Sequence, residues 1–405
     1  MASFFNKMRN LSIKSEVDRV INEKVMPQPP VHQEVTIMLS GALTIYLVAD
    51  LRDLARAGKA TVTLEDLEPP ISIHKVLGII KENKEALKES GAYVDIEERL
   101  TALENLKLHN NFGIMNTLLR ETVRVVEFVD VNAKDELVHA ITVNDAQKRI
   151  TVVFRGSVTT KDFITDAKVG QVKVDNPAFR LDEKTSKDAF RLHFGFYEYL
   201  FKKKCPNNKK LSRYESIVAS VKELLKQKPG YKLNVTGHSL GGALCTLFGF
   251  FAAADDEISK LTSGPVRVVS IASPYVGNVK FLLAFQSLER LNRLRHLRVA
   301  NAEDLVSLMP IAAPKLGLNI SDLKNGIADV YRHCGIKLHL NDLSKKGSEP
   351  VYKLTYPSTQ STEESIANEI SAFFEDGKNF VASISKVLKK SEQVRTNRLI
   401  LTSYL

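Results

Sequence analysis

Apolar residues recur at helical spacing in the N-terminal part of the chain. Residues 35–54 carry them as a wide stripe with a helical period, and residues 96–106 repeat this period more briefly. A stripe of this kind is typical of a helix that covers an apolar core on one side. We therefore expect residues 1–112 to form a helical region packed against the rest of the protein.

The spacing changes at Glu121, where apolar and polar residues begin to alternate. Farther along, apolar runs alternate with helical segments, which is typical of a mainly parallel sheet with helices on both faces. The runs that we predict as strands are residues 123–129, 137–143, 149–154, 232–235, 266–272 and 297–301. The expected fold class is α/β, with the central sheet in a domain over residues 113–360 and the helical region before it.

A serine between two glycines links one of these strands to a helical run. Ser239 follows the predicted strand at residues 232–235 and precedes an apolar run at residues 243–253. Gly237 and Gly241 stand two residues away on each side. The pattern G-x-S-x-G between a strand and a helix is the sequence form of a nucleophile elbow, where side chains larger than hydrogen would clash in the tight turn. We therefore interpret Ser239 as a candidate nucleophile.

Residues 361–405 form a third segment with apolar residues at helical spacing, interrupted at Gly377. Within it, residues 386–398 carry five basic residues and one acid, Glu392. A basic amphipathic helix of this kind suits the surface of an anionic membrane. A helix packed on the central domain would explain the same pattern, so both interpretations stay open.

Charge and cysteine content narrow the class of protein. The net charge of +10 suits nucleic acid or an anionic lipid surface, but no nucleic-acid motif accompanies the scattered basic residues, so we expect no nucleic-acid partner. Three cysteines cannot form a disulfide framework and indicate a reducing compartment. The run at residues 36–49 is too short to span a bilayer, and the N-terminus lacks the apolar region of a secretory signal. We expect a cytoplasmic protein, either free or held peripherally on membranes.

Four motifs follow one another in the order found in one enzyme family. They are residues 154–157 (F-R-G-S) with Asp162, Phe163 and Asp166 after them, the elbow around Ser239, residues 273–278 (S-P-Y-V-G-N), and residues 301–306 (N-A-E-D-L-V). Together they resemble the motifs of the class 3 lipases, the fungal-lipase-like branch of the α/β-hydrolases. The resemblance covers roughly residues 113–340 and implies an α/β-hydrolase fold that cleaves acyl esters of glycerolipids.

The resemblance also assigns roles around the candidate nucleophile. A serine hydroxyl is a poor nucleophile, so Ser239 needs a base to take its proton and an acid to orient that base. By resemblance the acid is Asp304, although a helix cap or a surface carboxylate would also explain an aspartate there. The same resemblance implies an oxyanion hole formed by the backbone N–H of Leu240 and by Ser157.

Further residues are expected to support this site. Gly237, His238 and Gly241 belong to the elbow, and Asp166 resembles the aspartate that steadies the oxyanion loop of the family. A plain helix cap would explain Asp166 almost as well. No cofactor or metal ion is expected, because this chemistry requires none and no metal-ligand spacing of His and Cys is visible.

The catalytic histidine is the point where the sequence departs from the family pattern. Only His333 and His339 follow Asp304, and a leucine stands at the family's usual base position within residues 399–405. Three interpretations stay open: one of these two histidines acts as the base after local rearrangement, the chain is an incomplete gene product, or the protein has lost hydrolysis and keeps lipid binding. His333 is the candidate base, whereas we interpret His193 and His238 as structural.

The sequence therefore predicts a serine hydrolase that resembles triacylglycerol lipases and cleaves glycerolipid esters through an acyl-enzyme on Ser239. Its expected partners are a glycerolipid substrate and the surface of a membrane or lipid droplet. The alternative is a catalytically silent lipid-binding protein that retains the pocket.

Overall fold

The computed structural model describes nine segments of the chain. They are residues 31–89, 123–130, 137–156, 170–181, 187–205, 208–301, 305–308, 331–340 and 352–355. The predicted helix at residues 96–106 and the predicted tail at residues 361–405 lie outside the described residues.

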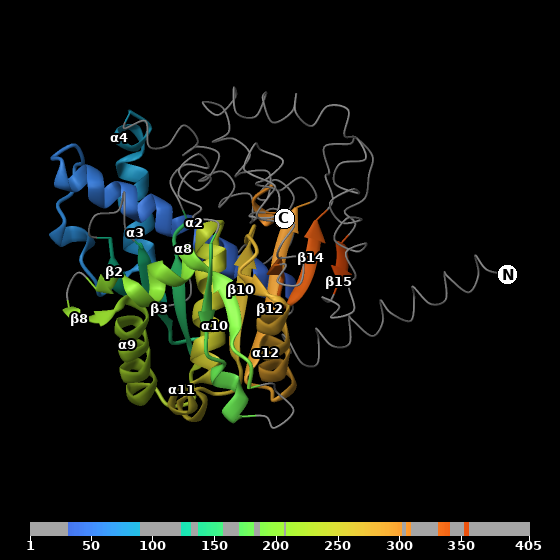
Figure 1. The fold of residues 1–405 in the computed structure, drawn as a ribbon. Helices are drawn as coiled ribbons and strands as arrows, with labels where there is room; N and C mark the ends of the chain where they lie inside the picture. Colours follow the sequence, from blue (N-terminus) through green and yellow to red (C-terminus); the bar gives the residue numbers. More distant parts are fainter. Residues whose placement is uncertain are drawn as a thin grey trace, which may run out of the picture.

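A sheet of nine strands forms the centre of the described structure (Figure 1). Its order is β1-β2-β3-β4-β9-β10-β12-β14-β15, and the strands from β4 to β14 run parallel to one another. At the edges, β1, β2 and β3 on one side and β15 on the other are antiparallel. The strands are β1 (Ile71–Ser72), β2 (Val123–Val129), β3 (His139–Asn144), β4 (Arg149–Phe154), β9 (Lys232–His238), β10 (Val266–Ile271), β12 (Leu294–Asn301), β14 (Ile336–Leu340) and β15 (Tyr352–Thr355). This arrangement confirms the predicted α/β class with its parallel centre.

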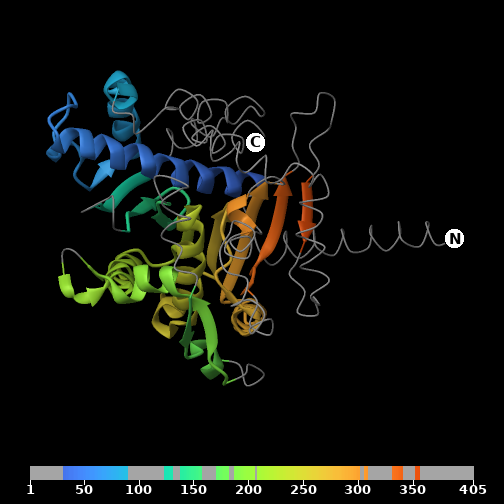
Figure 2. The same ribbon diagram turned by 45° about the horizontal axis from the view of Figure 1, so that its top comes forward.

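Helices cover both faces of the sheet (Figure 2). One face carries α2 (Val31–Arg56), while the other carries α9 (Arg213–Gln227), α10 (Leu240–Ala254), α11 (Asp256–Leu261) and α12 (Val279–Arg290). Side chains alternate along β4, so Val153 packs on the α2 side, whereas Ile150 and Val152 pack on the α10 side. The strands of the sheet are therefore apolar on both faces, which explains their nearly continuous apolar runs in the sequence.

The N-terminal helices belong to the same core as the sheet. After α2 come a 3₁₀ turn (Glu65–Leu67), α3 (Ile73–Glu82) and α4 (Lys84–Glu89). Ion pairs fix both ends of α2: Glu34 meets Arg149 of β4 at 2.7 Å, and Arg52 meets Asp130 at 2.9 Å. Among the helices that the structure describes, none is both long and apolar enough to span a membrane.

Helix α9 begins with a reciprocal pair of hydrogen bonds between Ser212 and Glu215. The backbone N–H of Ser212 donates to Oε2 of Glu215 at 2.7 Å, and the backbone N–H of Glu215 donates to Oγ of Ser212 at 3.2 Å. This reciprocal pair is a capping box, which satisfies two N–H groups that the helix leaves without acceptors. The start of α9 thereby follows from two residues of the sequence.

A second, smaller sheet lies beside the helices and was not predicted. Its order is β13-β11-β6-β5, and all its pairs are antiparallel. Its strands are β5 (Gln171–Val174), β6 (Phe190–His193), β11 (Gly277–Asn278) and β13 (Tyr331–Arg332). A separate pair of strands, β7 (Lys204–Cys205) and β8 (Asn208–Ser212), is also antiparallel, and the remaining described elements are α8 (Phe194–Tyr197), a π turn (Glu198–Lys202) and two 3₁₀ turns (Pro177–Arg180 and Leu305–Leu308). These strands have two to five residues, which is too short for alternation to be read from the sequence.

Candidate active site

Ser239 stands between the end of β9 and the start of α10 in a strained backbone conformation. Its φ is 58° and its ψ is −124°, a region that residues with a side chain rarely adopt. Such a conformation costs on the order of 1–3 kcal/mol and persists only where the surroundings enforce it. Here the backbone N–H of Ser239 donates to the carbonyl of Ile271 at 3.0 Å, while the Ser239 carbonyl accepts from the N–H of Gly242 at 2.8 Å. The turn is a nucleophile elbow in its backbone geometry.

The two glycines of the elbow are required by close backbone contacts. A Cβ on Gly237 would lie within 3.0 Å of the Gly241 carbonyl oxygen, and a Cβ on Gly241 would lie within 3.0 Å of the Phe154 carbonyl oxygen. Real Cβ atoms essentially never approach backbone atoms so closely. Any side chain at either position would therefore push α10 away from the ends of β4 and β9.

Gly156, at the end of the segment after β4, lies directly beside the nucleophile. A Cβ on Gly156 would fall 3.1 Å from the Cβ of Ser239 and even closer to the carbonyl of His238. The chain then continues into Ser157, which lies outside the described residues together with Asp166. The described part of this segment thus leads to the immediate neighbourhood of Ser239.

Leu240, the other residue expected in the oxyanion hole, is the first residue of α10. The first N–H groups of a helix have no acceptor within the helix and carry its partial positive charge. The Leu240 N–H therefore belongs to a set of donors suited to an anion beside Ser239.

Tyr46 of α2 links the segment that follows β4 to the residue that precedes Ser239. Its hydroxyl accepts a hydrogen bond from the backbone N–H of Gly156 at 2.9 Å and is 3.2 Å from Nδ1 of His238. The Tyr46 side chain is only 3 % exposed, and its ring meets that of His238 edge to face. The sequence placed Tyr46 in an apolar stripe, and its one distinguishing signal there was a hydroxyl group that a buried site must satisfy.

His333, the predicted base, hydrogen-bonds to a backbone carbonyl. Its Nε2 lies 2.7 Å from the carbonyl oxygen of Ser307, and its ring stacks on Tyr275 with centroids 3.7 Å apart. Burial, together with the nearby charge of Arg298, holds the pKa of His333 well below the usual value for histidine. The ring is therefore neutral at pH 7.

No hydrogen bond joins Ser239 to a histidine within the segments that the structure describes. The predicted acid, Asp304, lies outside these segments, between the end of β12 and the 3₁₀ turn at Leu305. The structure thus brings Ser239 together with Gly237, His238, Leu240 and Gly241, while the hydrogen bond that it shows for the His333 ring goes to the Ser307 carbonyl. The assignments of Asp304, His333, Ser157 and Asp166 stay predictions.

His193 is buried among aromatic side chains. It is 1 % exposed and stacks on Phe196 with ring centroids 4.0 Å apart. Neither ring nitrogen has a hydrogen-bond partner within the described part of the chain. Burial lowers the pKa of His193 from 6.5 to about 4, so the ring is neutral at pH 7.

Comparison with known proteins shows which family the region around Ser239 resembles. The model of the family described as Lipase (class 3) matches residues 151–313, which include the elbow. Phospholipase A1-Igamma1, chloroplastic, of Arabidopsis thaliana is 29 % identical over 254 residues, covering 58 % of this chain and 46 % of the relative. Phospholipase A1-II 6 of Oryza sativa subsp. japonica is 32 % identical over 181 residues, covering 42 % of this chain and 43 % of the relative.

The chain thus spans less than half the length of these two relatives. Among solved structures, the Rhizomucor miehei lipase propeptide complex has 22 % identity and a TM-score of 0.41, over 61 % of this chain and 65 % of the other. Residues 151–313, which contain the strained Ser239 and its glycines, thus match the class 3 lipase family.

Proposed function

We propose that this protein is a serine hydrolase that cleaves acyl esters of glycerolipids. The observation that carries the proposal is the backbone of Ser239, at a φ of 58° between β9 and α10. Strain of this kind is kept where function requires it, because it presents the hydroxyl at the end of a strand beside helix N–H groups. The match of residues 151–313 to the class 3 lipase family supports the same chemistry.

The proposed reaction passes through an acyl-enzyme. A base takes the proton of the Ser239 hydroxyl while the oxygen attacks the ester carbonyl, and the resulting oxyanion is stabilised by the N–H groups of Leu240 and residue 157. Each such donor contributes on the order of 3 kcal/mol to the transition state. The base then gives the proton to the leaving alcohol, and water releases the fatty acid by the same route in reverse.

We assign the acid to Asp304 and the base to His333 in this proposal. A neutral imidazole is the form that can accept a proton, and burial keeps His333 neutral at pH 7. Its Nε2 faces the Ser307 carbonyl, so reaching Ser239 requires a rearrangement of residues around His333. His339 is the second candidate, since it also follows Asp304 in the sequence.

Phospholipids are the first substrate class to test. Two relatives carry the name phospholipase A1, whereas the Rhizomucor miehei relative, 29 % identical over 169 residues, carries the name lipase. We propose that the protein meets its lipid at a membrane or lipid-droplet surface in a reducing compartment. The cytoplasm is our first choice, and the chloroplastic name of one relative makes the plastid the alternative that cell fractionation would distinguish.

A catalytically silent lipid-binding protein is the second candidate function. The observation in its favour is that Ser239 has no hydrogen bond to a histidine among the described residues, while His333 hydrogen-bonds to a carbonyl. Such a protein would bind lipid vesicles without releasing fatty acid.

Fatty-acid release from phosphatidylcholine vesicles and from a triacylglycerol emulsion separates the two candidates. For the enzyme, we expect release that falls by about 10⁴- to 10⁶-fold in Ser239→Ala, the usual loss when a catalytic serine is removed. His333→Gln should lower release as strongly, whereas His74→Gln, which changes an exposed histidine on α3, should leave it unchanged. Vesicle binding without release above the Ser239→Ala level would refute the enzyme and support the silent protein.

A further inference from the structure

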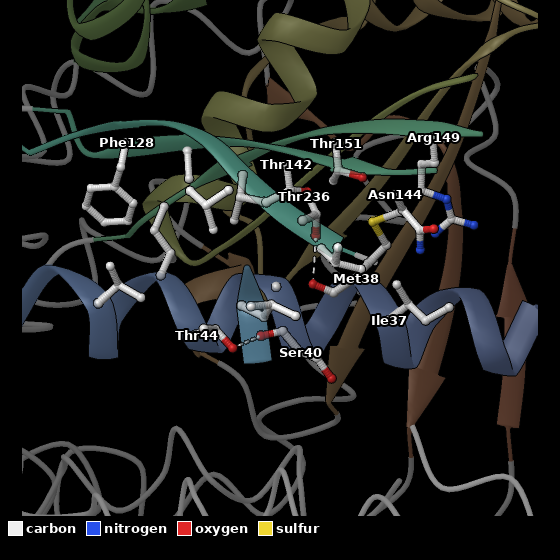
Figure 3. Close-up of a pocket in the computed structure, with 18 residues that line it drawn as sticks. Ile37, Met38, Ser40, Thr44, Phe128, Thr142, Asn144, Arg149, Thr151 and Thr236 are labelled. Atoms are coloured by element: carbon white, nitrogen blue, oxygen red, sulfur yellow. Dashed lines mark hydrogen bonds between the residues drawn. The ribbon is translucent and has the colours of Figure 1, made fainter. Parts of the chain in front are cut away.

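A cavity lies between α2 and the sheet, on the face opposite to α10 (Figure 3). It is bounded by α2 on one side and by β2, β3 and β4 on the other. Its volume is about 70 Å³ for the centres of water molecules. One water needs about 10–15 Å³ on this scale, so the space has room for about five waters or for part of an extended ligand.

The polarity of the cavity wall changes steadily along β3 and β4. At one end Asn144 pairs with Arg149, in the middle Thr142 pairs with Thr151, and beyond them Ala140 pairs with Val153. Because alternate residues of a strand face the same side, all six belong to one face of the sheet, and all six line the cavity. The wall therefore passes from charged through hydroxyl-bearing to apolar.

The charged end holds an arginine whose hydrogen-bonding groups are only partly used. Arg149 is 3 % exposed, and its Nη2 donates to Oε2 of Glu34 at 2.7 Å. Its Nε and Nη1 have no partner within the described part of the chain. A buried N–H without an acceptor costs on the order of 1–3 kcal/mol, and more when the group is charged. The site thus lacks acceptors for a cation that is already buried.

The surroundings of Arg149 add to this excess of positive charge. The second oxygen of Glu34 accepts from Nδ2 of Asn234 at 2.6 Å, so both oxygens of this carboxylate are occupied. Arg267 is 5 % exposed, and its Nε also lacks a partner among the described residues. Burial and the neighbouring positive charges, which Glu34 offsets only in part, lower the pKa of both Arg267 and Lys232. Three cations thus face one carboxylate here.

We propose that this cavity binds a long-chain carboxylate, that is, a fatty-acid anion. The carboxylate accepts hydrogen bonds from the free N–H groups of Arg149, and the chain extends past the threonine pair to the apolar end near Phe128. Figure 3 shows Arg149 and Phe128 at opposite ends of the lining, with α2 running alongside.

The length of the lining fits this class of ligand. Along α2 it extends from Ile37 to Val48, a stretch of 12 residues whose ends lie about 16 Å apart along the helix axis. The acyl chains of one bilayer leaflet span about 15 Å, half the thickness of the hydrocarbon core. The ligand is the kind of acid that ester hydrolysis would release, but the site uses neither Ser239 nor its neighbours and does not rest on the proposed function.

Titration calorimetry with palmitate tests the site in the full chain carrying Ser239→Ala, where hydrolysis plays no part. We expect palmitate to bind and Arg149→Gln to weaken binding by at least about 10-fold, because a charge-assisted hydrogen bond is lost. Arg124→Gln is the matched control, since Arg124 lies two strands away on β2 of the same sheet and is 45 % exposed in its side chain. Hexadecanol, which has no carboxylate, should bind the Ser239→Ala protein more weakly than palmitate does. Its affinity should be the same whether Arg149→Gln or Arg124→Gln is added.

A second variant keeps the test decisive if Arg149→Gln fails to fold. Gly41 lines the cavity on α2, and a Cβ there would meet Val153 at 3.7 Å, an ordinary contact. Gly41→Ala should therefore raise thermal stability, because alanine favours helix, while the methyl group weakens palmitate binding by about 4-fold. Binding that is equal in the parent, Arg149→Gln and Gly41→Ala, or palmitate that binds no better than hexadecanol, would overturn the proposal.

Discussion

Removing the hydroxyl of Tyr46 tests whether α2 helps to hold the elbow. In Tyr46→Phe the backbone N–H of Gly156 loses its acceptor at 2.9 Å in a site where the side chain is 3 % exposed. A buried donor left without an acceptor costs about 1–3 kcal/mol. The change also removes the group 3.2 Å from Nδ1 of His238, which keeps a further interaction. We therefore expect the free energy of unfolding to fall by about 1–3 kcal/mol, out of a usual 5–15 kcal/mol.

The same change should affect the reaction, since Gly156 leads into the proposed oxyanion donor. A displacement of about 1 Å at a reacting group costs on the order of 100-fold in rate. We expect kcat for ester hydrolysis to fall by about 10- to 100-fold while KM changes little. Urea unfolding followed by circular dichroism gives the stability, and fatty-acid release gives kcat and KM.

Thr44→Val is the matched control on the same helix. It removes a buried hydroxyl that donates to the Ser40 carbonyl at 2.8 Å. That carbonyl also accepts the backbone N–H of Thr44 in the helix, so it keeps a hydrogen-bond donor in the variant. We expect this variant to keep kcat and to lose little stability. A Tyr46→Phe protein that matches the Thr44→Val protein in both stability and kcat would refute the role given to Tyr46.

Two further changes address the fold around the site. Gly241→Ala places a methyl group against the Phe154 carbonyl. We expect the free energy of unfolding, measured with urea, to fall by at least about 2 kcal/mol and hydrolysis to be abolished. A soluble, active Gly241→Ala protein would contradict this close contact. His193 has its pKa lowered from 6.5 to about 4, so the unfolded chain binds its proton first as the pH falls. The free energy of unfolding is therefore not reduced by His193 above pH 6.5, and it falls by about 3 kcal/mol as the pH is lowered from 6.5 to 4. The urea midpoint of His193→Phe, relative to that of the parent, should therefore be higher at pH 4 than at pH 7.5. An equal difference between the two midpoints at both pH values would contradict this.

Much of the central sheet could be predicted because local pattern and tertiary environment agree there. Strands β2, β4, β9 and β10 lie where apolar runs predict them, and the capping box of Ser212 and Glu215 starts α9. The elbow was also predictable, because the glycines at 237 and 241 are required by contacts within a few residues of Ser239 and with one neighbouring strand. Such short-range requirements leave a direct trace in the sequence.

The role of α2 could not be predicted, because its contacts join residues far apart in the chain. Tyr46 meets Gly156 and His238 across separations of 110 and 192 residues, and its position in an apolar stripe indicates only burial. The unsatisfied N–H groups of Arg149 could not be predicted for the same reason. Arg149 lies at the start of a strand, and its partner Glu34 lies 115 residues earlier in the chain. The small second sheet could not be predicted because its strands are too short for an alternation of apolar and polar residues to be recognised.

The histidine of the site shows a different limit of sequence reasoning. Order along the chain indicated His333 and His339 as candidates, but order does not say which atoms a ring faces. The structure gives His333 a carbonyl partner and a stacking partner, Tyr275, and both must be considered in any movement toward Ser239. Its role as base stays a prediction that His333→Gln addresses.

Covalent labelling by a fluorophosphonate shows directly whether Ser239 is an activated nucleophile, because this probe reacts with an activated serine. We expect one adduct on the full chain by intact mass, located at Ser239 by peptide mapping, and none on Ser239→Ala. Folded protein that stays unlabelled, or an adduct that persists in Ser239→Ala, would contradict the claim that Ser239 is a catalytic nucleophile.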